Sequence, residues 1–267
     1  MGTTNATEID NFIKADSIEL SQLDDIKILI VDDCRVSSFR IKEILRSLSV
    51  TNVELCHSYQ DAVKLCQKND YNVLILDYHL EQDLNGSELY ELLIGKKYLT
   101  SYCSVITLSS DSSSQTVMNA LAKVQGAYLT KPTNSKVLSR KIQEAYASYK
   151  IQRAIFRFER SNETEQAIEL AIKYSIQNSF NTRMEFYILD FYEKHRTIEQ
   201  TIALCSRKEF ANRANFICKK IELEYQQNEL TIKNFILKLS LFIKDYPNHI
   251  RAFDLLSDAL VKSESNV

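Results

Sequence analysis

Apolar and polar residues follow two different patterns along the first half of the chain. Short, nearly continuous apolar runs rich in Ile, Val and Leu, beginning with Ile26–Val31, are typical of strands buried on both faces. Between these runs, apolar residues recur every three or four positions, as in an amphipathic helix. The predicted strands cover residues 26–31, 53–56, 73–76, 104–108 and 127–130, and the predicted helices cover residues 36–48, 60–67, 87–94 and 114–124 and a fifth that starts near residue 135.

Strands that alternate with helices predict βαβ units, and therefore a parallel sheet with helices on both faces. Right-handed crossovers make such a sheet doubly wound. Ligands of doubly wound sheets bind outside the carboxyl ends of the strands. The residues directly after each predicted strand are therefore the first ones to inspect for chemistry.

The second half of the chain has helical periodicity and no strand-like alternation. Asn134 or Ser135 is expected to cap one long helix, which runs to about Arg160 and bridges the two halves. Residues 151–267 are predicted to be entirely helical. We therefore expect a polar tail over residues 1–24, a sheet domain over residues 25–147 and a helical domain over residues 148–267.

A repeat marks the helical half. Glu165–Leu170 (EQAIEL) returns 34 residues later as Glu199–Leu204 (EQTIAL), and Pro247 precedes the last predicted helix, Ile250–Val261. This period is that of tetratricopeptide repeats, stacked helical hairpins that bind a peptide or a helix. The alternative is an irregular helical bundle that serves as a dimerisation domain. Four Asn and Arg residues in the first helix of each predicted hairpin are interpreted as solvated surface: Asn181, Arg183, Asn212 and Arg213.

The composition agrees with this division. The 267 residues include only four glycines and two prolines, and Pro247 is the only residue of either type from Thr133 onward. Such a chain favours long helices over sandwiches or propellers, which need many sharp turns. A net charge of −2 gives no basic field for nucleic acid, and no apolar run is long enough for membrane insertion. Six cysteines without a CxxC pair predict reduced thiols in a cytoplasmic protein.

Charged and hydroxyl residues follow four of the predicted strands. Asp32 and Asp33 follow the first strand, Asp77 the third, Ser109 the fourth and Lys131 the fifth. Carboxylates crowded at one sheet edge repel one another unless a cation lies among them, and hard oxygen ligands suit Mg²⁺. An Asp carboxylate can then act as the nucleophile that forms an aspartyl phosphate. Lys131 and Ser109 are placed to hold phosphoryl oxygens.

With these residues, the segment from about residue 25 to residue 147 resembles the receiver domain of two-component response regulators. The matching motifs are Val31-Asp32-Asp33, Leu74-Ile75-Leu76-Asp77, Ile106-Thr107-Leu108-Ser109-Ser110 and Tyr128-Leu129-Thr130-Lys131-Pro132. The resemblance implies a flavodoxin-like fold that accepts a phosphoryl group from a histidine kinase or phosphotransfer protein with Mg²⁺. It implies no enzyme activity beyond the domain's own phosphorylation and dephosphorylation.

The resemblance also implies residue roles at the metal. Asp77 matches the phosphoacceptor, Asp33 a direct ligand of Mg²⁺, and Asp32 a ligand that acts mainly through water. His79, two residues after the phosphoacceptor, matches the position that gives a backbone carbonyl to the metal. The loop after Asp77 (YHLEQDLNG) departs from the family because it lacks the usual proline and is one residue longer before Gly86. This departure affects the expected metal geometry and dephosphorylation rate.

The remaining roles concern the switch. Ser109 matches the switch Ser/Thr, Tyr128 matches the switch aromatic three residues before the lysine, and Lys131 matches that active-site lysine. Phosphorylation of Asp77 would draw Ser109 toward the phosphoryl group and let Tyr128 turn inward, a local charge event that biases a two-state element. Asp111 lies where the family varies and where side chains influence access of the hydrolytic water.

We therefore expect a response regulator whose output is protein–protein interaction through the helical domain, with an unidentified protein partner. The alternatives are a receiver that controls a catalytic domain beyond Val267, a phosphate sink without output, and a DNA-binding protein. DNA binding is disfavoured because the most basic stretch, Arg207–Lys220, contains Glu209 and lacks a turn glycine. The last helix has no following partner helix, so we expect either a fragment of a longer protein or pairing with a second subunit in a homodimer.

Overall fold

The computed structural model of the chain describes residues 25–80, 84–111, 126–177 and 182–264. The predicted tail over residues 1–24, the predicted helix over residues 114–124, part of the loop after Asp77, and Asn181 lie outside these described residues. The contacts divide the chain into two units, residues 1–167 and residues 168–267. We call them the sheet unit and the helical unit.

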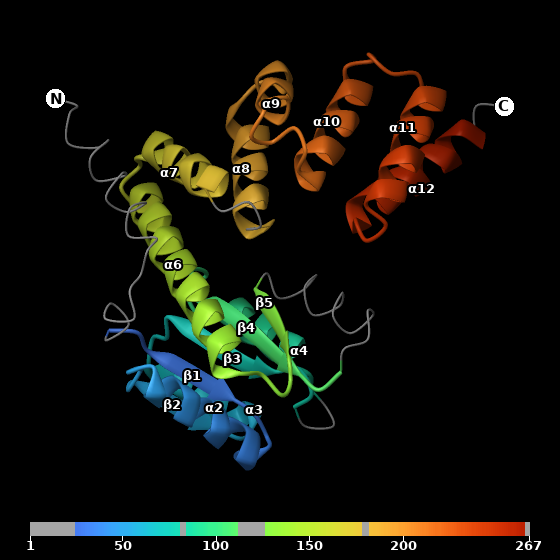
Figure 1. Cartoon of the computed structure of the whole chain (residues 1–267). Coiled ribbons are helices and arrows are strands. Elements are labelled where there is room, and N and C mark those ends of the chain that lie inside the picture. The colour runs from blue at the N-terminus through green and yellow to red at the C-terminus, as the bar shows by residue number, and fades with distance from the viewer. Residues whose placement is uncertain (1–24, 81–83, 112–125, 178–181, 265–267) are drawn as a thin grey trace. The chain divides into compact units, whose positions relative to one another are not determined.

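The described part of the sheet unit contains a five-stranded parallel sheet in the order β2-β1-β3-β4-β5 (Figure 1). This arrangement confirms the predicted doubly wound fold, since the strand order reverses at β1 and described helices pack on both faces of the parallel sheet. The strands are β1 (Ile28–Val31), β2 (Val53–Cys56), β3 (Val73–Asp77), β4 (Ser104–Ser109) and β5 (Ala127–Thr130). The helices are α2 (Arg35–Ser47), α3 (Tyr59–Lys68), α4 (Gly86–Gly95) and α6 (Ser135–Arg160).

Alternate residues of the central strands enter two different cores, because successive side chains of a strand point to opposite faces. Ile28 and Ile30 pack in a cluster with Leu45 of α2 and Ile142 of α6. Leu29 packs in the other cluster, together with side chains from α3 and α4. Each face of the sheet is therefore covered by helices. Because both faces are buried, successive strand residues are all apolar, which explains the continuous apolar runs in the sequence.

Side-chain caps start three of these helices where the sequence places a suitable residue. Asn134 caps α6, as predicted, and its side chain accepts a hydrogen bond from the Val137 amide. Ser58 caps α3 in the same way. Asn85 and Glu88 form a capping box at the start of α4, in which each side chain accepts from the other residue's amide. These caps fix where the chain leaves the sheet edge and turns into helix.

The described helical unit contains helices in sequence and no strand (Figure 1). The division between the units falls within α7 (Thr164–Gln177). The following helices are α8 (Thr182–His195), α9 (Ile198–Cys205), α10 (Ala214–Gln226), α11 (Ile232–Asp245) and α12 (Ile250–Glu264). Helices α7, α9 and α11 begin at intervals of 34 residues, whereas the intervals between α8, α10 and α12 are 32 and 36 residues.

A chain of polar contacts runs from α7 through α8 and α10 to the residue that precedes α12. The Arg213 guanidinium donates to the Ser175 hydroxyl at 2.7 Å and lies 3.4 Å from Glu185. The Asn215 amide donates to the other Glu185 oxygen at 2.7 Å and contacts the His249 ring at 3.1 Å. The interpretation of Arg213 as solvated surface is therefore wrong, because its side chain is only 11% exposed. A buried guanidinium needs the carboxylate and carbonyl partners that Glu185 and Ser175 provide.

Candidate functional site

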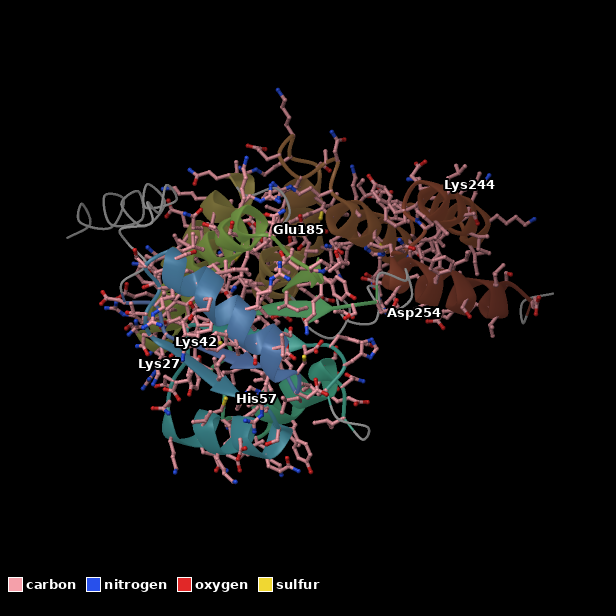
Figure 2. All side chains as sticks on the ribbon, turned by 60° about the horizontal axis from the view of Figure 1, so that its bottom comes forward. Lys27, Lys42, His57, Glu185, Lys244 and Asp254 are labelled. Carbon is pink, nitrogen blue, oxygen red and sulfur yellow. The ribbon has the colours of Figure 1, made fainter. Side chains whose placement is uncertain are left out.

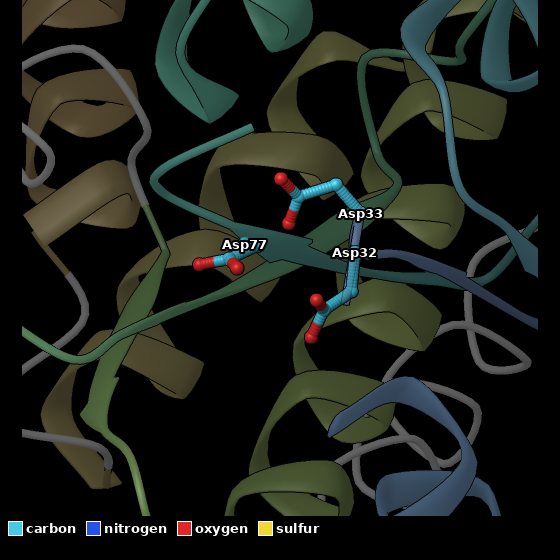
Figure 3. Close-up of side chains that lie close together, drawn as sticks. All are labelled: Asp32, Asp33 and Asp77. Atoms are coloured by element: carbon cyan, nitrogen blue, oxygen red, sulfur yellow. The ribbon is translucent and has the colours of Figure 1, made fainter. Parts of the chain in front are cut away.

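Three carboxylates meet at the carboxyl edge of the sheet, where the sequence predicted a ligand site. Asp32 and Asp33 follow β1, and Asp77 is the last residue of the neighbouring strand β3. Each of the three offers a carboxylate oxygen that lies within 4.8 Å of the others (Figure 3). Asp32 and Asp77 are buried and Asp33 is exposed, so the cluster opens to solvent on the side of Asp33.

Lys131 reaches this cluster from the end of β5. Its ammonium nitrogen donates to Asp32 Oδ2 and to Asp77 Oδ2, both at 2.8 Å. The peptide bond between Lys131 and Pro132 is cis. The Lys131 amide also donates to the Ser109 carbonyl oxygen at 2.7 Å, which ties the residue to the end of β4. Side chains from β1, β3 and β5 are thus brought together, although as many as 99 residues separate them in sequence.

The charges at this edge do not balance. Among the described residues, Lys131 is the cation that pairs with Asp32 and Asp77, and Asp33 has no ion-pair partner. Burial raises the pKa of Asp77, and the Asp32 charge adds to this effect, while the Lys131 contact and the His79 backbone amide oppose it. Burial alone would lower the pKa of Lys131, but its hydrogen bonds with Asp32 and Asp77 raise it instead. Three carboxylates against one ammonium leave an excess of negative charge that a cation would neutralise.

Three residues that the sequence analysis did not select hold Asp32 in place. The Ser37 hydroxyl, on the first turn of α2, donates to Asp32 Oδ2 at 2.7 Å, and the Cys34 amide donates to Oδ1 at 2.9 Å. His57 Nδ1 lies 2.9 Å from the Asp32 carbonyl oxygen (residue labelled in Figure 2), and that oxygen can only accept, so the ring donates from Nδ1. His57 directly follows β2, so the rule that selected the other strand-end residues also points to it.

The two predicted switch residues are connected through Asp111. The Ser109 hydroxyl is fully buried and accepts a hydrogen bond from the Asp111 amide at 3.0 Å. The Tyr128 hydroxyl donates to the Asp111 carbonyl oxygen at 2.5 Å. Because the Ser109 oxygen serves as the acceptor, its own hydrogen is left to donate to another group. The backbone of Asp111 therefore couples β4 to β5.

The loop after Asp77 packs closely against the strand end. The Gly86 amide donates to the Tyr78 carbonyl oxygen at 2.9 Å. A Cβ atom at Gly86 would collide with the backbone carbonyl oxygen of Asp77, so this position requires glycine. His79 is exposed beside the cluster, and its ring stands edge-on to Tyr78 with a centroid separation of 5.0 Å. The loop residues 81–83, where the length departure falls, lie outside the described residues.

Comparison with known proteins finds matches to part of the sheet unit. Residues 28–143 match the family model described as the response regulator receiver domain. The sheet and its helices have the flavodoxin-like fold of that domain. Among curated proteins, the chain is similar to the chemotaxis protein CheY of Pseudomonas aeruginosa, with 24% identity over 121 residues that cover 45% of this chain and 96% of CheY.

Solved structures of similar proteins cover the same half of the chain. A receiver domain of a Francisella response regulator is 24% identical, with a TM-score of 0.41, and the match covers 46% of this chain and 97% of that one. A response regulator receiver domain protein from Methanospirillum hungatei JF-1 is also 24% identical, with a TM-score of 0.43 and coverage of 48% and 98%.

None of the described helices is both long and apolar enough to cross a membrane.

Proposed function

We propose that the chain is a response regulator that accepts a phosphoryl group on Asp77 from a histidine kinase or a phosphotransfer protein. The observation that carries this proposal is the cluster of Asp32, Asp33 and Asp77 with Lys131 at the carboxyl edge of a receiver fold. Receiver domains are signalling modules that interact with such phosphodonors, and residues 28–143 match that family. The roles of the individual residues follow from the positions that match the family's motifs.

The donor set fits Mg²⁺. Three carboxylates offer hard oxygen ligands, the outermost of which is open to solvent, and the excess of negative charge favours a divalent cation. Asp33 and Asp77 would hold the ion directly, Asp32 mainly through water, and His79 through its backbone carbonyl. When bound, Mg²⁺ neutralises charge and orients the incoming phosphoryl oxygens.

The chain's own residues supply the remaining steps. An Asp77 oxygen attacks phosphorus, the bond from phosphorus to the donor's histidine nitrogen breaks, and that nitrogen keeps the electron pair. The Lys131 ammonium group already donates a hydrogen bond to Asp77, and it can donate one to a phosphoryl oxygen once Asp77 carries the group. Ser109 can donate its hydroxyl hydrogen to another phosphoryl oxygen. Such a shift would strain the bonds that Ser109 and Tyr128 make to Asp111, so we propose these two residues as the switch.

The helical unit is proposed as the output, a set of tetratricopeptide-like hairpins that binds a protein. Helix starts at intervals of 34 residues in α7, α9 and α11 support this assignment. Stacked hairpins bury one face against their neighbours and present the other to a peptide or helix. We place the protein in the cytoplasm, where its phosphodonors act and its cysteines stay reduced.

The phosphorylation step is tested with acetyl phosphate and Mg²⁺, followed by intact-mass and peptide mass spectrometry. The full chain should gain one phosphoryl group on Asp77, and EDTA should prevent it. Asp77→Asn should gain none, whereas Asp70→Asn, which changes an exposed carboxylate outside the cluster, should react as the wild type. Modification of Asp77→Asn at the wild-type rate, or none of the wild type, would contradict the assignment.

The output is tested separately by hydrogen exchange with and without beryllofluoride. If phosphorylation acts through the helical unit, exchange should change in α7–α12 in the wild type and stay constant in Asp77→Asn. A chain that reacts at Asp77 but shows no such change would be a phosphate sink instead.

A further inference from the structure

Helix α12 is apolar on two faces. Ala252, Leu255 and Ala259 are buried in a cluster with side chains from α10 and α11. On another face, Ile250, Phe253 and Leu260 are 56%, 46% and 45% exposed. A helix that is apolar on more than one side is ordinarily covered on each of them.

The exposed row of α12 has the spacing of a coiled-coil seam. Ile250, Phe253, Ser257 and Leu260 recur at alternating intervals of three and four residues. The row contains no charged side chain, and its polar member, Ser257, is small. Asp254 and Asp258 lie outside the row, whereas the exposed Glu264, four residues after Leu260, falls in line with it at the end of the helix. From Ile250 to Leu260 this row can pack closely against another helix over about 16 Å of α12.

Helix α11 adds a second exposed row with complementary charge. Leu237 and Leu241, one turn apart, are 57% and 52% exposed. Lys233 and Lys244 are exposed on this helix, and no ion pair to either is found within the described residues. Elsewhere in the helical unit the exposed large apolar residues are scattered, as with Phe186 on α8 and Ile198 on α9. The concentration on α11 and α12 is of the kind that marks an interaction surface.

We infer that this surface, formed by the exposed rows of α11 and α12, binds a second copy of the chain through a two-fold axis. Helices α11 and α12 pack in the same cluster, and their exposed charges include lysines on α11 and aspartates on α12 (Lys244 and Asp254 are labelled in Figure 2), so two copies can place opposite charges against each other. A partner of one charge sign would leave half of these charges unmatched. The aspartates beside the apolar row also oppose nucleic acid and anionic membranes.

If the two α12 helices pack antiparallel, the side chains of the two exposed rows match each other in size. It places the bulky Phe253 opposite the small Ser257 of the second copy, and Ile250 opposite Leu260. The loop between α11 and α12 is short, so the last turn of α11, with Lys244, lies beside the first turn of α12. In the antiparallel pair this end meets the second half of the other α12, where Asp258 lies. One helix pair makes a small interface, so the dimer should form at micromolar concentrations rather than nanomolar ones.

The test is the molar mass of the full chain, measured by sedimentation equilibrium from about 1 to 200 µM. The mass should rise from 30.9 kDa toward twice that value with concentration. Phe253→Glu should remain monomeric at every concentration. The matched control is Phe186→Glu on α8, which changes a phenylalanine with the same 46% exposure and should dimerise as the wild type. A monomeric wild type, or equal dimerisation of Phe253→Glu, would overturn the inference.

Charge reversal tests the arrangement without altering the apolar row. Lys244→Glu and Asp258→Lys should each weaken the dimer by about tenfold at low salt, because each brings like charges together. The double variant should regain most of the wild-type affinity. Additive weakening in the double variant would reject the antiparallel pairing, even if Phe253→Glu failed to fold. The inference does not depend on Asp77, so the outcome is independent of the phosphorylation test.

Discussion

Both units bury ionised side chains, but they balance the charge differently. In the helical unit, Glu185 faces Arg213 and Asn215, and Glu222 lies between Lys219 and Arg251, so each carboxylate has a cation beside it. At the sheet edge, Asp32 and Asp77 share the Lys131 ammonium group, and Asp33 has no ion-pair partner among the described residues. A balanced buried pair is complete without a ligand, whereas an unbalanced cluster costs stability until a cation arrives. This difference separates a structural polar network from a site for chemistry.

The strongest test of the comparison removes the cation from the balanced network. Arg213→Ala should destabilise the helical unit by about 3–5 kcal/mol, because it leaves the buried Glu185 carboxylate without a cation beside it. Urea unfolding followed by circular dichroism at 222 nm measures this loss. Arg207→Ala is the matched control, since Arg207 lies over the same Phe210 ring but pairs with the exposed Glu209. Its effect should stay below about 1 kcal/mol.

A second variant separates lost charge compensation from lost packing. Adding Glu185→Gln to Arg213→Ala should recover part of the stability, because the amide no longer carries an uncompensated charge. No recovery would mean that the guanidinium acts mainly by packing on Phe210. Charge balance would then not be what distinguishes the Glu185 network from the carboxylates at the sheet edge.

An effect of intermediate size is expected when a cation is added to the unbalanced cluster. Mg²⁺ at about ten times its Kd should stabilise the sheet unit by roughly 1.4 kcal/mol, because the ion binds the folded state alone. Asp33→Asn should abolish this gain while leaving the stability without Mg²⁺ equal or slightly higher, since it relieves repulsion. Thermal unfolding with and without Mg²⁺ provides the measurement. Equal stabilisation of the wild type and Asp33→Asn would remove Asp33 from the ion's ligands.

The smallest expected effect concerns the pH dependence of the helical unit. Burial lowers the pKa of His249 from its usual value of 6.5, so the folded state binds a proton less readily than the unfolded state. Stability should therefore be full above pH 6.5 and decline below it, until the lower folded pKa is reached. Denaturant unfolding of His249→Gln between about pH 8 and 5.5 should show a smaller decline than the wild type.

The exposed His195 gives the control for that measurement. His195→Gln should keep the wild-type decline with pH. An identical decline in His249→Gln would mean that another group, such as the buried Glu185, governs the pH response of this unit.

Much of the sheet unit follows from local sequence. The limits of β2, β5 and α6 agree with the prediction, because continuous apolar runs, turn residues and the Asn134 cap act over a few residues. The strand-end rule also brought together Asp32, Asp77 and Lys131 correctly. Their assigned chemistry remains a prediction, as do the domain limits at residues 25, 147 and 148.

Long-range partners could not be inferred in the same way. Arg213 looks like any surface arginine in sequence, because Glu185 and Ser175 lie 28 and 38 residues away. On α2, Val36 and Phe39 have the spacing of a buried face but are 80% and 60% exposed, since the sheet covers only part of that helix. Periodicity shows that a face is apolar, and only the packing of other elements decides whether it is covered.

The length of α6 has a mechanical consequence. The helix begins a few residues after Lys131 and continues for 26 residues, which is about 39 Å (Figure 1). A rigid rod of that length acts as a lever: a tilt of about 5° at its first turn moves its far end by roughly 3 Å. A displacement of that size exceeds the tolerance of a hydrogen bond, so an adjustment of a fraction of an ångström at the strand end can break or make contacts at the other end of the helix.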